Sequence, residues 1–130
     1  MPGKLVLFSP WADLTCKGES FVTNARRDAM FNPDAVRALG SYLTRGCDAL
    51  DPELSPVHGD FRGFPDMLIF AGSTEIFLDD ARRVARRARE AGVRAELHVY
   101  RHMPHVFPIF AAVVPSAKSA FETVRRFVEA

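Results

Sequence analysis

Two predicted strands with an amphipathic helix between them constrain most strongly what this chain can fold into. Residues Met67–Ala71 are continuously apolar, which predicts a buried strand, and residues Ala95–Tyr100 are predicted to form another strand. The stretch Ile76–Ala91 places alanines and Val84 on one face and arginines on the others, and Gly92 follows where a helix is expected to end. A strand, a helix and a second strand at this spacing form a parallel crossover unit. The chain is therefore predicted to be an α/β protein.

One more strand and one more helix are predicted outside this unit. Residues Lys4–Phe8 are continuously apolar after the lysine, which is typical of a strand buried on both faces. Residues Ser116–Val128 have apolar side chains at helical spacing, and Ser116 can cap this helix. Residues 66–130 are thus expected to form a regular βαβα arrangement. With the first strand they predict three parallel strands with flanking helices.

The segment after the first strand is long and mostly irregular. Residues 11–65 are rich in Pro, Gly, Asp and Ser, and only Pro33–Thr44 shows the spacing of an amphipathic helix. An irregular connection of this length within a compact domain usually serves a function or forms a lid. A chain of 130 residues is long enough to bury one core, so residues 1–130 are expected to form a single domain.

The charge balance argues against a nucleic-acid partner. Lys and Arg number 17 and Asp and Glu number 16, so the formal net charge is +1 and no strong field attracts a polyanion. The arginines of the 76–91 helix lack interleaved aromatic residues for base stacking, which favours a solvated helix face. The apolar stretch within residues 1–10 is too short for a signal-peptide core or a membrane span. We therefore expect a cytoplasmic protein without a membrane span.

The two cysteines, Cys16 and Cys47, have neither the spacing of a zinc knuckle nor that of a redox pair. We expect them to be buried free thiols, since free cysteine behaves as a small apolar residue. A disulfide between them is the alternative, although secreted scaffolds of this size usually contain more pairs.

Polar side chains follow all three predicted strands. Ser9–Asp13 comes after the first strand, Gly72–Glu75 after the second and His102–His105 after the third. Because the carboxyl ends of parallel strands meet at one edge of the sheet, Glu75 and His105 are expected to lie close together. The carboxylate would accept an imidazole N–H and fix the tautomer of a general base. We expect this pairing to raise the pKa of His105, because a nearby carboxylate favours imidazolium.

Other roles for these side chains stay open at this point. Glu75 could instead be a carboxylate that complements the dipole at the start of a helix. His105 could instead be a loop histidine that is hydrogen-bonded to the backbone. Asp79 and Asp80 lie further along the helix than Glu75, so we predict that they are helix-start charges.

A metal site is a further alternative. His98 and His102 have the same parity on a strand and could join His105, with Glu75 as an oxygen ligand. No ligand motif such as H-E-x-x-H supports this arrangement.

The nucleophile of a hydrolase with this architecture is absent from the sequence. No G-x-S-x-G pentapeptide occurs, and the nearest match, Gly18–Val22, lacks the second glycine and lies in the irregular segment. No H-G-G-G run is present to help build an oxyanion hole.

A set of short motifs occurs in order along nearly the whole chain. They are Ser-Pro-Trp-Ala-Asp-Leu-Thr at Ser9–Thr15, then Ser20, Asn24, Asp28, Tyr42, Asp51-Pro52, Ser55-Pro56, Gly72–Asp80 and Met103–Phe107. This set resembles the hormone-sensitive-lipase-like esterases of the α/β-hydrolase fold. Such enzymes hydrolyse short- to medium-chain carboxylic esters without a cofactor, through a triad of Ser, Asp or Glu, and His.

The resemblance implies roles for particular residues. Glu75 would be the catalytic acid and His105 the general base, in agreement with their expected places at adjacent strand ends. The chain order Ser, acid, His assigns the nucleophile and the oxyanion glycines to the N-terminal half of such enzymes. The sequence thus resembles the C-terminal half, a partial α/β-hydrolase fold without a nucleophile, and no metal or cofactor is implied.

Two functions are compatible with this resemblance. The chain is a carboxylic ester hydrolase half that needs an N-terminal half to act on a small ester, or it is a catalytically inactive truncated hydrolase that folds as an oligomer. A weaker alternative is a His/Glu metal-binding protein. The strand Leu5–Phe8 would leave an apolar edge open in either of the first two, so we expect a homo-oligomer or an N-terminal hydrolase half to pair with it.

Overall fold

The computed structural model describes residues 2–130, in which strands alternate with helices. In chain order the elements are β1 (Lys4–Phe8), α1 (Ser20–Thr23), α2 (Pro33–Leu43), the 3₁₀ helix η1 (Pro56–His58), β2 (Asp66–Gly72), α3 (Leu78–Glu90), β3 (Ala95–Tyr100), the 3₁₀ helix η2 (Phe107–Phe110) and α4 (Pro115–Glu129). Every strand and helix expected from the sequence is present, and the α/β class is confirmed.

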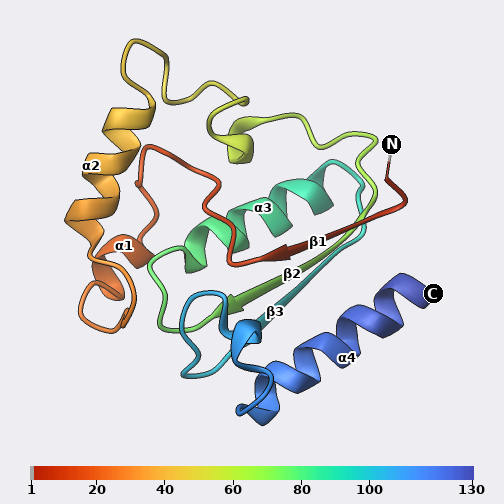
Figure 1. Cartoon of the computed structure of the whole chain (residues 1–130). Helices are drawn as coiled ribbons and strands as arrows, with labels where there is room; N and C mark the ends of the chain where they lie inside the picture. Colours follow the sequence, from red (N-terminus) through yellow and green to blue (C-terminus); the bar gives the residue numbers. More distant parts are fainter. Residues whose placement is uncertain (1) are drawn as a thin grey trace.

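The three strands form one parallel sheet in the order β1-β2-β3 (Figure 1). Leu5 of β1 lies beside Met67 of β2, which in turn lies beside Ala95 of β3. Helix α3 makes the crossover from β2 to β3, as parallel pairing requires. All three strands therefore end at the same edge of the sheet, and the loops that follow them meet there.

One helix covers each face of the sheet (Figure 1). Met67, Ile69 and Ala71 of β2 belong to the core under α3, whereas Leu68 and Phe70 belong to the core under α4. This alternation explains the unbroken apolar run in β2, since both of its faces are buried.

Strand β1 is less buried than the sequence predicts. Its five residues are all only half-buried, because no strand within residues 2–130 pairs with the outer side of β1. By contrast, Leu68 and Ile69 in the central strand have no exposed surface. Both faces of the strand pack against a core as predicted, with Leu5 and Leu7 towards α3 and Val6 and Phe8 towards α4, but the burial is only partial.

The helix ends differ from expectation in two places. Helix α3 begins at Leu78 rather than Ile76, so Glu75 lies in the turn between β2 and α3. Helix α4 has Val114 at its N-cap and no side-chain cap, so the prediction that Ser116 caps this helix is wrong. The proline at the first helical position starts the helix one residue earlier, because its fixed φ suits that position.

The long connection is more ordered than predicted. It contains α1 and η1 besides the expected α2. Side chains from this connection pack on the turn that carries Glu75, in a core of Cys16, Phe21, Val36, Ile76 and Phe77. Both cysteines are free as expected, but Cys47 is exposed, so the prediction of burial is confirmed for Cys16 only.

Within residues 2–130, no helix has both the length and the hydropathy of a membrane span. The longest helix, α4, has 15 residues, whereas a span needs about 20.

Candidate active site

The structure brings Glu75 and His105 together at the carboxyl edge of the sheet. Glu75 follows β2 and its side chain is fully buried, whereas His105 lies on the loop after β3 with 16% of its side chain exposed. The Nδ1 atom of His105 lies 3.7 Å from Oε2 of Glu75. This distance is too long for a hydrogen bond, and within residues 2–130 neither His105 Nδ1 nor Glu75 Oε1 has a hydrogen-bond partner.

A serine side chain completes the contacts of this pair. The hydroxyl group of Ser9 donates a hydrogen bond of 2.7 Å to Oε2 of Glu75. The Ser9 hydroxyl oxygen accepts a hydrogen bond of 2.9 Å from the backbone N–H of Val106. Ser9 was expected to follow the first strand, but nothing in the sequence indicated that its hydroxyl group contacts the carboxylate of Glu75.

Burial dominates the electrostatics of this site. Removal from water raises the pKa of Glu75 to about 7, although the Ser9 hydroxyl acts in the opposite direction. Burial also lowers the pKa of His105, while the negative charge of Asp28 opposes this shift. The prediction that His105 has a raised pKa is therefore wrong, because loss of water outweighs a carboxylate that is too distant to bond with the ring.

The loop that carries His105 rests on the residues that end β2. A side chain at Gly72 would overlap the carbonyl oxygen of Met103, so the close approach of this loop requires glycine. The Thr74 hydroxyl donates to the same carbonyl at 2.9 Å, and the Ser73 hydroxyl accepts from the backbone N–H of His102 at 2.9 Å. The short polar segment after β2 thus carries Glu75 and also supports the loop that carries His105.

An apolar hollow opens beside the imidazole of His105. The ring lies edge-on to Phe31, with centroids 4.8 Å apart, and next to Phe77, at 5.2 Å. The hollow has a volume of about 460 Å³, and its polar lining consists of Ser9, Asn32 and His105. Its apolar wall comes from the loop after β1, from the loop before α2, from α2 itself and from the turn before α3, and consists of Trp11, Met30, Phe31, Ala35, Val36, Leu39 and Phe77.

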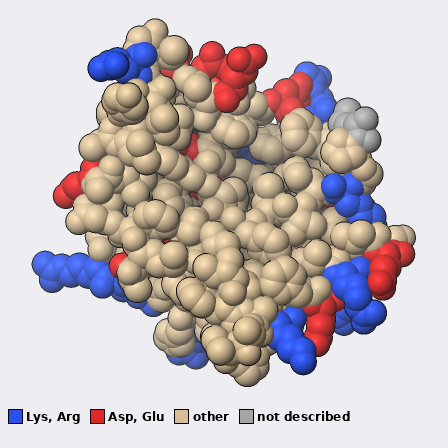
Figure 2. All heavy atoms as spheres, viewed as in Figure 1, with Lys and Arg blue, Asp and Glu red and all other residues tan. Residues whose placement is uncertain are grey.

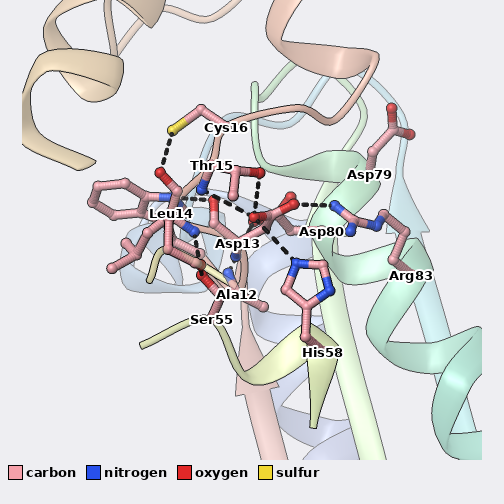
Figure 3. Close-up of polar contacts among 12 residues, drawn as sticks. Ala12, Asp13, Leu14, Thr15, Cys16, Ser55, His58, Asp79, Asp80 and Arg83 are labelled. Atoms are coloured by element: carbon pink, nitrogen blue, oxygen red, sulfur yellow. Dashed lines mark hydrogen bonds and ion pairs between the residues drawn. The ribbon is translucent and has the colours of Figure 1, made fainter. Parts of the chain in front are cut away.

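Sequence reasoning missed a buried polar network that fastens the loop after β1 to α3 (Figure 3). Asp80 was expected to be a helix-start charge, but it is fully buried, and its Oδ2 atom accepts from the backbone N–H groups of Ala12 and Asp13. Asp13 is itself buried and forms an ion pair with Arg83 at 2.5 Å. The ring of His58 lies 3.6 Å from Asp13.

The helical spacing contained a signal for this burial. Asp80 lies one turn before Val84 and two turns before Ala88, so it falls on the apolar stripe of α3. Asp79 remains in the first turn as predicted, where it accepts a hydrogen bond from the backbone N–H of Ser20.

The arrangement offers no support for the metal alternative. Among residues 2–130, no three His, Cys, Asp or Glu side chains lie close enough to hold a metal ion. His98 instead stacks on Phe70 and approaches Glu96 of its own strand at 3.7 Å.

The fold and this edge of the sheet match known hydrolases. A model of the alpha/beta hydrolase fold family matches residues 1–109. The chain belongs to this family. Among solved structures, it superposes on a hormone-sensitive lipase from a metagenome library with a TM-score of 0.94 and 36% identity, over 99% of this chain and 44% of that one. An esterase from the bacterial hormone-sensitive lipase family gives a TM-score of 0.93 and 38% identity, over 98% and 43%.

Curated relatives have the same relationship in sequence. An esterase of Acinetobacter venetianus is 38% identical over 98% of this chain, and an acetyl-hydrolase of Streptomyces hygroscopicus is 34% identical over the same share. The chain spans only 42% and 43% of the lengths of these relatives. The predicted resemblance to hormone-sensitive-lipase-like esterases and the partial α/β-hydrolase fold are thus confirmed.

Proposed function

We propose that this chain supplies the acid and the base of a carboxylic ester hydrolase. The observation that supports this proposal most directly is the approach of the buried Glu75 carboxylate to the Nδ1 atom of His105, at 3.7 Å, beside an apolar hollow. Glu75 orients the imidazole and stabilises its protonated form. His105 takes the proton of an attacking serine hydroxyl and then gives it to the leaving alcohol.

The nucleophilic serine comes from a segment outside residues 1–130. The buried serines near Glu75 are already engaged: Ser9 donates to the carboxylate, and Ser20 donates to the backbone carbonyl of Ile76. The G-x-S-x-G motif that exposes a serine on a strand-to-helix turn is absent from this chain. A second hydrolase segment must therefore supply the serine and the oxyanion donors.

The substrate is a small ester with an apolar group. The hollow of about 460 Å³ beside His105 has an aromatic and aliphatic wall, which favours an alkyl or aryl part of the ester over a charged one. Closing this hollow over an apolar group removes water from the reacting carbonyl and strengthens the interaction between the acid and the base.

The N-terminal hydrolase segment pairs with the open edge of β1. Apart from Lys4 at its first position, β1 has no charged residue, whereas β3, at the other edge, contains Glu96 and His98, and charged side chains discourage edge pairing. Figure 2 shows that Lys, Arg, Asp and Glu lie mainly around the margin of the visible face. A weakly charged face beside an unpaired strand suits a covering hydrolase segment.

The test is hydrolysis of a short p-nitrophenyl ester by the chain alone and with an added hydrolase segment that contains the G-x-S-x-G and H-G-G-G motifs. We expect no activity above that of the His105→Ala variant for the chain alone. The mixture should hydrolyse the ester, and His105→Ala should reduce the rate roughly a thousandfold or more.

The control is His102→Asn, on the same loop but with an exposed side chain, which keeps a residue that tolerates the positive φ of 61° at this position. This variant should retain the activity of the mixture. Equal activity of the mixture with His105→Ala would contradict the proposed role. A stable mixed complex without activity would favour the alternative of a catalytically inactive hydrolase that folds as an oligomer.

A further inference from the structure

Ser9 forms hydrogen bonds with the proposed acid and with the residue that follows the proposed base. Its side chain is buried, with 3% of the residue exposed. Its hydroxyl hydrogen reaches Oε2 of Glu75, the carboxylate oxygen that also faces the His105 ring, and its oxygen accepts from the backbone N–H of Val106. Val106 directly follows His105 in the chain. One hydroxyl group therefore contacts both the acid and the backbone that carries the base.

The backbone is strained at both ends of the hydrogen bond between Ser9 and Val106. Each residue has a φ of 49°, in the left-handed region that residues other than glycine seldom adopt. For a β-branched residue such as Val106 this conformation is especially unfavourable, and it persists only where surrounding contacts impose it. Strain of this kind is common at functional sites. Here the strained residues lie in the loops after β1 and β3, and the Ser9 hydroxyl joins these two loops.

The loop that begins with Ser9 is firmly attached to the rest of the site. The backbone N–H of Ser9 donates to the carbonyl of Phe70 in β2 at 2.8 Å. Three and four residues further on, Ala12 and Asp13 donate their N–H groups to the buried carboxylate of Asp80 on α3 (Figure 3). Ser9 is thus fixed relative to both elements that flank Glu75, which is what a rigid support for a catalytic pair requires.

We infer that Ser9 is a positioning residue whose hydroxyl group joins the carboxylate of Glu75 to the loop that carries His105. The inference rests on the proposed function. The direct distance of 3.7 Å between Glu75 and His105 is too long for a hydrogen bond, so the Ser9 hydroxyl is the group that links acid and base here. Oε2 of Glu75 has lone pairs for both the Ser9 hydroxyl and an approaching imidazole N–H.

Removal of this hydroxyl changes the charge state of Glu75. Burial raises the pKa of the Glu75 carboxyl group, and the negative charges of Asp28 and Asp80 raise it further. The same group faces the ring of His105. The Ser9 hydroxyl opposes these effects because it donates to the ionised carboxylate. Without it, the pKa of Glu75 should rise further, and fewer molecules should hold the carboxylate in its charged form near neutral pH.

The experiment compares Ser9→Ala and Ser9→Gly with the unaltered chain. Both variants lack the hydroxyl, but glycine tolerates the positive φ, so Ser9→Gly folds without the backbone strain that alanine retains. The pKa of Glu75 is measured by carbon NMR of its labelled carboxyl group, and the exchange rate of the Val106 amide by hydrogen exchange. We expect a higher Glu75 pKa and roughly five- to tenfold faster Val106 exchange in both variants.

Ser55→Ala is the matched control. The Ser55 hydroxyl is also buried and also bridges two segments, since it donates to the carbonyl of Ala49 and accepts from the N–H of Leu14. It touches neither Glu75 nor His105 by hydrogen bond, so this variant should leave the Glu75 pKa unchanged.

A Glu75 pKa that stays unchanged in both Ser9 variants, or that rises as much in Ser55→Ala, would overturn the inference. Neither readout depends on ester hydrolysis. A raised Glu75 pKa together with an inactive mixture would therefore count against the proposed function alone, whereas an active mixture with an unchanged pKa would count against the role of Ser9 alone.

Discussion

Glu75 combines full burial with a pKa near 7, so its charge state depends on small changes in its surroundings. Its Oε1 atom has no hydrogen-bond partner within residues 2–130, and Oε2 has the single hydroxyl of Ser9. A buried carboxylate with so few donors is costly to ionise. This cost links the charge state of Glu75 to the stability of the fold.

We expect Glu75→Gln to change how stability depends on pH. In the folded chain Glu75 keeps its proton up to about pH 7, whereas in the unfolded chain it loses the proton near the ordinary value of 4.5. The stabilising contribution of Glu75 is thus fully present below pH 4.5 and is lost as pH rises through 7. The free energy of unfolding of the unaltered chain, relative to that of Glu75→Gln, should fall over this window by at most about 1.4 kcal/mol per pH unit.

Urea unfolding between pH 4 and 8 provides the measurement. His105, with its lowered pKa, acts in the opposite sense and is present in both chains, so the difference isolates Glu75. Glu53→Gln is the control, because Glu53 is exposed and the same substitution there should give a nearly constant difference. A difference that rises with pH for Glu75→Gln would show that the carboxylate is stabilised in its charged form.

The sequence was sufficient to predict that Glu75 and His105 lie close together, but not to predict their surroundings. Their approach could be predicted because both residues follow strands whose parallel pairing brings the strand ends together. The direction of the pKa shift of His105 could not be predicted from the sequence. It depends on burial by Phe31 and Phe77 and on the distance from Glu75, and the spacing of these residues along the chain does not determine either. The link through Ser9 depends on two loops that are far apart in the chain.

At the scale of elements, α3 has two kinds of arginine that look alike in the sequence. Most lie on the solvated face, as predicted, and Arg82 pairs there with Asp79. Arg83, by contrast, has only 28% of its side chain exposed and pairs with the buried Asp13. Burial would raise the pKa of Asp13, but the Thr15 and Arg83 side chains donate hydrogen bonds to the carboxylate, and the pKa is lowered. The prediction of a solvated arginine face is thus wrong for Arg83.

These two arginines predict different costs for the same substitution. Arg83→Met keeps the aliphatic stem but leaves the Asp13 carboxylate buried without its counter-charge, so we expect a loss of about 3 kcal/mol in the free energy of unfolding. Arg82→Met removes an exposed pair and should cost less than about 1 kcal/mol. Denaturant unfolding of both variants measures the difference, and equal losses would mean that Asp13 does not need Arg83.

The same elements show why secondary structure was easier to predict than the network. The apolar stripe of α3 gives its position because helical periodicity is a local property. The partners of Asp80 and Arg83 lie in the loop after β1, nearly seventy residues earlier. Only the sheet order places that loop beside α3, so these contacts could not be read from local spacing.

At the scale of the whole molecule, the sheet formed within residues 2–130 has one well-covered strand and two open edges. β2 is buried from Met67 to Gly72, whereas every residue of β1 is only half-buried. Apolar residues at an open edge, together with unpaired backbone groups, promote association with another strand. The family members that match this chain are more than twice its length, which is consistent with a covering segment beside β1.

This open edge predicts self-association of the chain when no other hydrolase segment is present. At tens of micromolar, light scattering should give a mass well above the 14.5 kDa of one chain. Val6→Pro removes a backbone N–H group from the open edge of β1 and should shift the chain towards the monomer, because proline interferes with edge pairing. Val99→Pro, the matching substitution on β3, is the control and should leave the mass unchanged. A monomer without any substitution would contradict this prediction, and dissociation by Val99→Pro alone would place the contact at β3.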